Sequence, residues 1–294
     1  MSTLARVPFR VLLDGATAGV RRHFRRLFPA IALPLAAGSV VVVLMQMSVL
    51  RGMAGAETPD LKTVFGLVGP LFAAAIVFWV IYVLAFNATV VSAMDAVAGR
   101  PIQLRRAWLF SLRPPVLGTL FLMGLAGAVS LMLCLVPALY VLPVLGFVLP
   151  VMVDEGRASF EAIRRGVDLA HHNPSGEFLH YPWLQVLAVL VLGTVFSYAL
   201  AMLVQLPFAI VQQVLLFREA ASDSAAMPIS GLYVALQIPA SVLGSGAYTI
   251  AWMFQAFALC ILFQEVRRRK EGGDIQAAID ELTGGPAATE AEPS

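Results

Sequence analysis

Long intervals without a charged side chain are the feature of this sequence that most restricts its fold. None of Asp, Glu, Lys or Arg occurs between Lys62 and Asp95, between Arg113 and Asp154, between Glu177 and Arg218, or between Asp223 and Glu265. A helix that crosses a membrane needs about 20 mostly apolar residues. With 59% hydrophobic and 13% charged residues, the chain also lies outside the usual composition of water-soluble domains. We therefore expect a membrane protein.

Six membrane-spanning helices account for the apolar intervals. Apolar length places them at about residues 28 to 50, 64 to 90, 115 to 136, 138 to 153, 183 to 206 and 240 to 263. Of the 20 Lys and Arg residues, only Arg51, Lys62 and Arg218 then lie on the side away from the N-terminus. Short cytoplasmic loops carry this excess of basic residues. The sequence predicts an all-α, polytopic membrane helix bundle in a bacterial inner membrane, with both termini in the cytoplasm.

Three parts of this threading are less regular. The segment 138–153 is short and proline-rich, so it either spans fully or forms half of a broken or re-entrant hairpin. Residues 208–217 and 231–239 either lie along the outer surface or complete long tilted helices. Residues 265–294 are expected to form a cytoplasmic tail, with a short amphipathic helix capped by Asp274 and a disordered end.

Arginine-rich amphipathic segments precede three of the predicted spans. Residues 1–27 form a basic cytoplasmic helix, and a similar helix follows Ser159, in which Phe160, Ile163 and Val167 share one face. A less regular copy precedes the third span. The membrane domain, residues 28–264, is then either a three-fold repeat of surface helix plus hairpin or an ordinary arrangement of basic helices at the inner face.

Each amphipathic segment contains an Arg-Arg pair, and these pairs are the candidate functional residues. They are Arg21, Arg22, Arg105, Arg106, Arg164 and Arg165. Cations held at the level of the lipid headgroups attract anionic lipid by roughly 1 kcal/mol each. We therefore expect these arginines to contact anionic lipid. The alternative is that they only set the topology.

The stretch from Pro137 to His172 joins a proline-broken apolar hairpin to the sequences PVMVDEG and SFEAIRRGVDLA. It resembles the integral-membrane domain attached to some bacterial glycerophosphodiester phosphodiesterases, and related stand-alone multispan proteins of unassigned function. The resemblance extends loosely over most of the chain, although Gly166 stands where that family often has serine. In those enzymes the chemistry belongs to a separate soluble barrel with no counterpart in this sequence. The resemblance therefore implies a membrane domain without phosphodiesterase activity.

Histidines are the remaining candidates for chemistry. His171 and His172, with His180 nearby, could ligate a metal, but adjacent histidines on a helix point in different directions. No cysteine or carboxylate cluster joins them at a metal-binding spacing. We expect neither a metal nor a cofactor, and no known catalytic motif occurs.

The sequence favours a non-enzymatic scaffold or accessory protein of the inner membrane. Its basic cytoplasmic face would contact anionic lipid or a protein partner, and a net charge of +2 gives no indication of nucleic-acid binding. A permease or channel component is the alternative, supported by the proline-broken spans and opposed by the lack of charge within them. A membrane-embedded lipid-modifying enzyme comes third. It would require His171, His172 or His180 to meet Asp154, Glu155 or Asp168 in one cleft.

Overall fold

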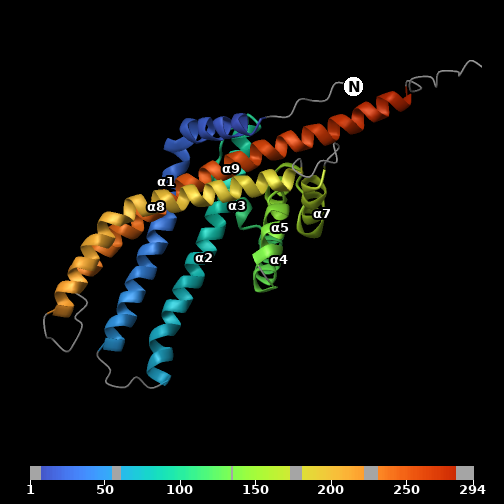
Figure 1. Ribbon diagram of the computed structural model, residues 1–294. Coiled ribbons are helices and arrows are strands. Elements are labelled where there is room, and N and C mark those ends of the chain that lie inside the picture. The colour runs from blue at the N-terminus through green and yellow to red at the C-terminus, as the bar shows by residue number, and fades with distance from the viewer. Residues whose placement is uncertain (1–7, 55–60, 134, 173–180, 222–230, 283–294) are drawn as a thin grey trace, which may run out of the picture.

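The computed structural model describes residues 8–54, 61–133, 135–172, 181–221 and 231–282, and across them the chain is all-helical (Figure 1). The helices are α1 (Phe9–Ala54), α2 (Leu61–Val97), α3 (Leu104–Ser111), α4 (Pro114–Leu133), α5 (Leu135–Leu145), α6 (Val148–Asp154), α7 (Ser159–Ala170), α8 (Pro182–Ala221) and α9 (Gly231–Leu282). Six segments in these ranges are long and apolar enough to cross a membrane: Phe9–Leu50, Val68–Val97, Pro114–Leu133, Val136–Asp154, Pro182–Leu215 and Ala235–Gly272. The predicted polytopic helix bundle is confirmed.

The core of the bundle forms around α9, which packs against α1, α2 and α8. Large side chains of α9 are buried between these neighbours, among them Trp252, Met253, Phe257 and Phe263. In a bilayer, lipid tails are as apolar as these side chains, so close packing, not escape from water, holds such helices together. The buried and tightly packed face of α9 therefore holds the bundle together.

Helix α1 contains both the predicted basic segment and the first predicted span. Pro29 and Pro34 lie inside it, and neither can donate the backbone hydrogen bond that a helix interior requires. Prolines at such positions are a common cause of helix bends. Figure 1 shows the first part of α1 running across the top of the bundle and the remainder descending beside α2. The expected boundary near residue 27 is thus a bend within one helix, with no break.

The proline-rich segment 138–153 is broken into α5 and α6 at Gly146–Phe147. The Gly146 backbone N–H donates to the carbonyl of Pro143 at 3.0 Å. A Cβ atom at Gly146 would lie 2.7 Å from Cγ1 of Val186 on α8, closer than real side chains approach. Glycine at this position therefore permits the close contact between α5 and α8. Together the two short helices are still long enough to cross a membrane.

Residues 208–217 and 231–239 complete long helices, as the second of the two alternatives predicted, because they continue α8 and α9. Nε2 of Gln212 donates to Oε1 of Gln237 at 2.8 Å and joins these extensions. At its other end α9 runs through Gly272 and Gly273 to Leu282, where a separate helix capped by Asp274 was expected. The Arg267–Glu271 pair, 2.7 Å long and one turn apart, supports the helix up to these glycines. The expected disordered end, residues 283–294, lies outside the described residues.

The hairpin of α4 and α5 stands apart from the α1–α2 pair and contacts α7 and α8 instead (Figure 1). Its outward side chains are strongly exposed, as Met132 at 88% and Phe121 at 71% illustrate. Exposed apolar surface of this extent is typical of a helix that faces lipid. A surface helical segment precedes each of the hairpins α1–α2, α4–α5 and α8–α9. The three-fold repeat itself stays a prediction.

Candidate functional site

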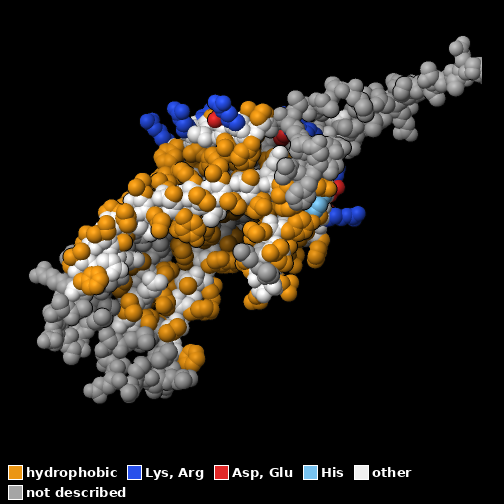
Figure 2. All heavy atoms as spheres, in the orientation of Figure 1, with side chains coloured by type: hydrophobic (Ala, Val, Ile, Leu, Met, Phe, Trp, Pro, Cys, Tyr) orange, Lys and Arg blue, Asp and Glu red, His pale blue; other side chains and the backbone are white. Residues whose placement is uncertain are grey.

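Most charged side chains of the bundle gather at one end, which we call the basic end. It comprises the first part of α1, the end of α2 with α3, the end of α6 with α7, and the part of α9 after Phe263. Figure 2 shows charged side chains along the upper and right edges of the molecule and mainly hydrophobic ones over the described surface between and below them. In Figure 1 the start of α1 lies at this end, whereas the last turns of α1 and α8 and the first turns of α2 and α9 lie at the opposite end.

Asp95, near the end of α2, is the most deeply buried carboxylate at the basic end. Its side chain is 1% exposed, and Oδ1 lies 3.0 Å from Nε of Arg100 and 3.9 Å from an Nη atom of Arg106. Gly99, with a φ of 70°, ends α2 in the left-handed conformation that glycine adopts most readily. This turn directs Arg100 back toward Asp95. A buried carboxylate needs such partners because burial without them is very costly.

Arg100 also connects Asp95 to a second carboxylate, Asp154 at the end of α6. An Nη atom of Arg100 lies 3.6 Å from Oδ1 of Asp154, and Arg267 of α9 contacts the other oxygen of that carboxylate. Asp95, Arg100, Asp154 and Arg267 therefore alternate in charge. They join α2, α6 and α9, which are distant in sequence.

Arg165 of α7 is the centre of a second group of ion pairs. Its guanidinium lies 3.1 Å from Glu155, 3.4 Å from Asp168 and 3.4 Å from Glu271 of α9. Lys270 also contacts Asp168, and this hydrogen bond, with help from Arg165, holds the pKa of the Asp168 carboxyl below its usual value. We call the two groups together the ion-pair network.

Four of the six candidate arginines lie outside the ion-pair network. Arg21, Arg22, Arg105 and Arg164 are exposed, and none forms an ion pair within the part of the chain that the structure describes. Arg106 is 51% exposed and reaches Asp95 only at 3.9 Å. Arg165, at 16% exposed, is occupied by carboxylates. The structure thus separates two members of an Arg-Arg pair, Arg164 and Arg165, that sequence analysis treated alike.

The sequence analysis did not predict the ion-pair network, because its partners are not neighbours on one helix. Arg165 instead uses Glu155, ten residues before it, and Glu271, on another helix. A usable signal was present, because carboxylates follow three of the predicted spans at the inner side: Asp95 after the second, Asp154 and Glu155 after the fourth, and Glu265 and Glu271 after the sixth.

The histidines do not assemble a catalytic cluster within the described ranges. Nε2 of His171 lies 2.6 Å from the hydroxyl of Tyr140, and Nδ1 lies 2.7 Å from the carbonyl of Val167. Since a carbonyl only accepts, Nδ1 carries the proton and Nε2 accepts from Tyr140. His180 lies outside the described residues. The described part of the chain brings no three His, Cys, Asp or Glu side chains into a metal-binding group.

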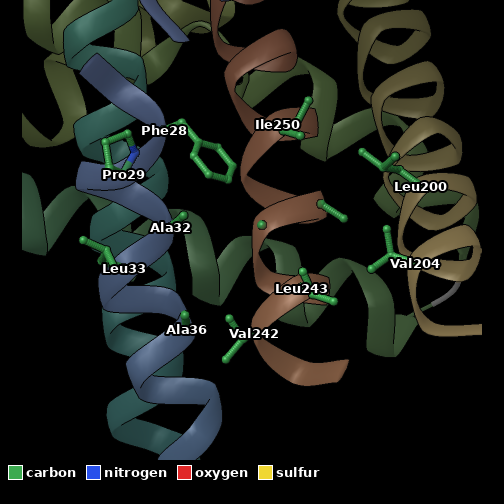
Figure 3. A pocket seen from close by; sticks show the side chains of 12 residues that line it. Phe28, Pro29, Ala32, Leu33, Ala36, Leu200, Val204, Val242, Leu243 and Ile250 are labelled. Atoms are coloured by element: carbon green, nitrogen blue, oxygen red, sulfur yellow. The ribbon is translucent and has the colours of Figure 1, made fainter. Parts of the chain in front are cut away.

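An apolar groove lies beneath the bend of α1, between α1, α8 and α9 (Figure 3). Its volume is about 440 Å³, within the range of roughly 300–1,000 Å³ typical of ligand pockets. Every lining side chain is apolar, including Phe28 and Ala36 of α1, Leu200 and Val204 of α8, and Leu243 and Ile250 of α9. Groove and basic end meet at Phe28, close to Arg25 in the sequence.

These features define an integral, polytopic α-helical membrane protein with a basic end and an apolar groove. No protein-family model, no curated protein and no solved structure matches the chain. The resemblance to the membrane domain of glycerophosphodiester phosphodiesterases therefore stays a prediction, and function has to be argued from the side chains.

Proposed function

We propose that this protein is a non-enzymatic scaffold or accessory protein of the bacterial inner membrane, whose basic end faces the cytoplasm and contacts anionic lipid or a protein partner. One observation carries the proposal: the exposed arginines Arg21, Arg22, Arg105 and Arg164 have no carboxylate partner among the described residues. Basic side chains nearer the core are paired. The charge left over is therefore positive and outward-facing.

The distribution of charge supports the cytoplasmic orientation of this end. Of the 20 Lys and Arg residues, only Arg51, Lys62 and Arg218 belong to the opposite end. Short cytoplasmic segments of inner-membrane proteins carry this bias. Anionic lipids on that side attract Lys and Arg by about 1 kcal/mol each near the surface, and salt weakens the attraction within a Debye length.

The packing of the bundle favours a scaffold over a permease. The core around α9 is filled by large apolar side chains, among them Trp252, Phe257 and Phe263. A polar solute crossing a membrane needs polar groups to replace its hydration, and a permease would supply them near the middle of the spans. The ion-pair network lies at the basic end instead.

The contacts of His171 favour a non-enzymatic role over a lipid-modifying enzyme. Both ring nitrogens are engaged, by Tyr140 and by the backbone of Val167. The carboxylates that could assist are also engaged in ion pairs: Asp154 with Arg267, Glu155 with Arg165, and Asp168 with Lys270 and Arg165. None of these groups is poised to take a proton from a substrate.

The test is native mass spectrometry of the protein released from its own membrane. The variant replaces Arg21, Arg22, Arg105 and Arg164 by glutamine. Arg51→Gln, near the other end of α1, is the matched control. We expect the variant, but not the control, to lose most of its retained anionic lipid or its bound partner. If the wild type, the variant and the control retained the same lipid and partner, the arginines would only set the topology.

A further inference from the structure

The apolar groove and the basic end are aligned along one side of α1. Pro29 and Ala36 line the groove. On the same face of α1, Arg25 lies one helical turn before Pro29, and Arg22 lies two turns before it. Both arginines are exposed, and neither has an ion pair with a described residue. The apolar groove thus has two exposed arginines, which lack a described ion-pair partner, at one end.

The groove exists because the residues on its floor are small. Ala32 and Ala36 of α1 face Gly246 and Ala247 of α9, and a Cβ added at Gly246 would come within 3.5 Å of the Phe28 ring. Larger side chains stand on the rim, where Leu33 is 68% and Leu243 is 47% exposed. Figure 3 shows Leu200 and Val204 of α8 closing the other side.

The depth of the groove suits one lipid chain. From Pro29 to Ala36 the helix rises about 10 Å, which covers much of one leaflet of a hydrocarbon core about 30 Å thick. The groove starts at the bend of α1 and runs from the basic end toward the middle of the bundle. A lipid of that leaflet would therefore place its chain in the groove and its phosphate beside the arginines.

We infer that this groove binds an acyl chain of an anionic phospholipid, and that Arg22 and Arg25 hold the lipid phosphate. The inference rests on the proposed function only for the orientation of the basic end. A second copy of the chain fits the site less well, because a symmetric pair would bring four like-charged arginines together. A zwitterionic lipid would leave the arginines without a net negative partner.

The experiment uses the full chain in nanodiscs that contain phosphatidylglycerol with a photoreactive group midway along one acyl chain. Cross-linked residues are located by mass spectrometry, and unlabelled phosphatidylglycerol or phosphatidylcholine competes. Ala36→Phe fills the floor, and Leu243→Phe narrows the rim at a position exposed enough to accept it. Ala73→Phe, on the exposed face of α2, is the control for added bulk. The double change Arg22→Gln and Arg25→Gln removes the charge, and Arg268→Gln on α9, an exposed arginine without an ion pair among the described residues, is its control.

We expect cross-links to concentrate on groove residues of α1, α8 and α9, and phosphatidylglycerol to displace them better than phosphatidylcholine. Either phenylalanine in the groove and the double glutamine change should each lower the labelling about tenfold, equivalent to about 1.4 kcal/mol. Both controls should leave it unchanged. Equal competition by the two lipids, equal labelling of α2, or a cross-linked dimer would each overturn the inference.

The outcome separates this inference from the proposed function. If Arg105→Gln and Arg164→Gln strip lipid or partner from the protein while the groove stays unlabelled, the proposed function holds and the lipid site does not. If the groove is labelled as expected but those changes have no effect, the lipid site holds and the wider role of the basic end does not.

Discussion

The first part of α1 and the helix α7 carry the same sequence pattern and contact α9 in different ways. The α1 segment packs closely on α9, where a Cβ on Gly19 would lie 2.5 Å from the Phe257 ring. Among the described residues, its arginines find no carboxylate apart from the weak Arg10–Asp14 contact of 3.9 Å. Helix α7 instead reaches α9 through ion pairs of Arg165 and Asp168.

The difference shows what decides the role of an Arg-Arg pair at a membrane surface. Arg21 and Arg22 stay available because no carboxylate of the described residues reaches them. Arg165 becomes structural because Glu155 and Glu271 arrive from elsewhere in the chain. Helix propensity and amphipathicity are alike in the two cases, so the partners brought by tertiary structure make the distinction.

Removing Arg100 should have the largest effect, because it leaves a buried carboxylate with one distant partner. Asp95 is 1% exposed, and after Arg100→Met only Arg106, at 3.9 Å, remains. Taking one member from a buried ion pair costs roughly 3–5 kcal/mol, so we expect a loss of about 3 kcal/mol in unfolding free energy. Unfolding in detergent micelles measures it.

Two further variants make the test of Arg100 specific. Asp95→Asn combined with Arg100→Met removes the uncompensated charge and should recover part of the loss. Arg22→Gln, an exposed arginine of α1, should change stability by less than about 0.5 kcal/mol. If Arg100→Met were as mild as Arg22→Gln, the two kinds of arginine would not differ in the way proposed here.

Gly19→Leu should have the next largest effect, because it tests how the α1 segment is attached. A side chain there would collide with Phe257, and overpacking of this kind typically costs about 1–3 kcal/mol. Gly118→Leu, with nothing within 4 Å of its added Cβ, is the matched control and should be neutral. Thermal unfolding in micelles compares the two. Equal stability would mean that α1 does not depend on this contact.

Arg165→Gln should lower stability and Arg164→Gln should lower lipid retention, although the two residues are neighbours. Arg165 is 16% exposed and contacts three carboxylates, so its loss should lower the unfolding free energy by about 1 kcal/mol. Arg164 is exposed and has no ion pair with a described residue, so its change should spare stability and reduce retained anionic lipid. If both variants affected the same measurement, the separation of paired from unpaired arginines would be wrong.

The spans were predictable because each is a run of apolar residues, which a short window of the sequence is enough to detect. A break in the segment 138–153 was one of the two alternatives that its prolines suggested, whereas the close contact of Gly146 with Val186 joins residues distant in sequence. The continuation of α9 to Leu282 was not anticipated. Its glycines and Asp274 favour a helix end locally, and ion pairs such as Arg267–Glu271 oppose it.

The site was predictable in kind but not in detail. Arg-Arg pairs mark the basic end from sequence alone, since the positive-inside bias is a property of composition. Which arginine of a pair is free depends on where α9 and the turn after α6 place Glu271 and Glu155. The apolar groove has no local signature at all, because Ala36, Val204 and Leu243 come from separate helices.

Acidification should loosen α7 from α9, and this is the smallest effect we predict. The hydrogen bond from Lys270 lowers the pKa of Asp168 in the folded protein, with Arg165 acting in the same direction. A carboxyl with a depressed pKa stabilises the fold at pH values above its unfolded pKa of about 3.9. That contribution disappears as the pH falls through the lower, folded pKa.

Comparison of the wild type with Asp168→Asn isolates this contribution. The carboxyl is 49% exposed, so its pairs should contribute no more than the roughly 0.2–1 kcal/mol of surface ion pairs. Urea is the suitable denaturant because, unlike guanidinium, it does not screen charges. The difference in unfolding free energy should stay constant from neutral pH to about pH 5 and then shrink as the pH falls below about 4. If the difference in unfolding free energy persisted in acid, packing would hold α7 against α9, as it holds the first part of α1. The contrast between the two helices would then be wrong.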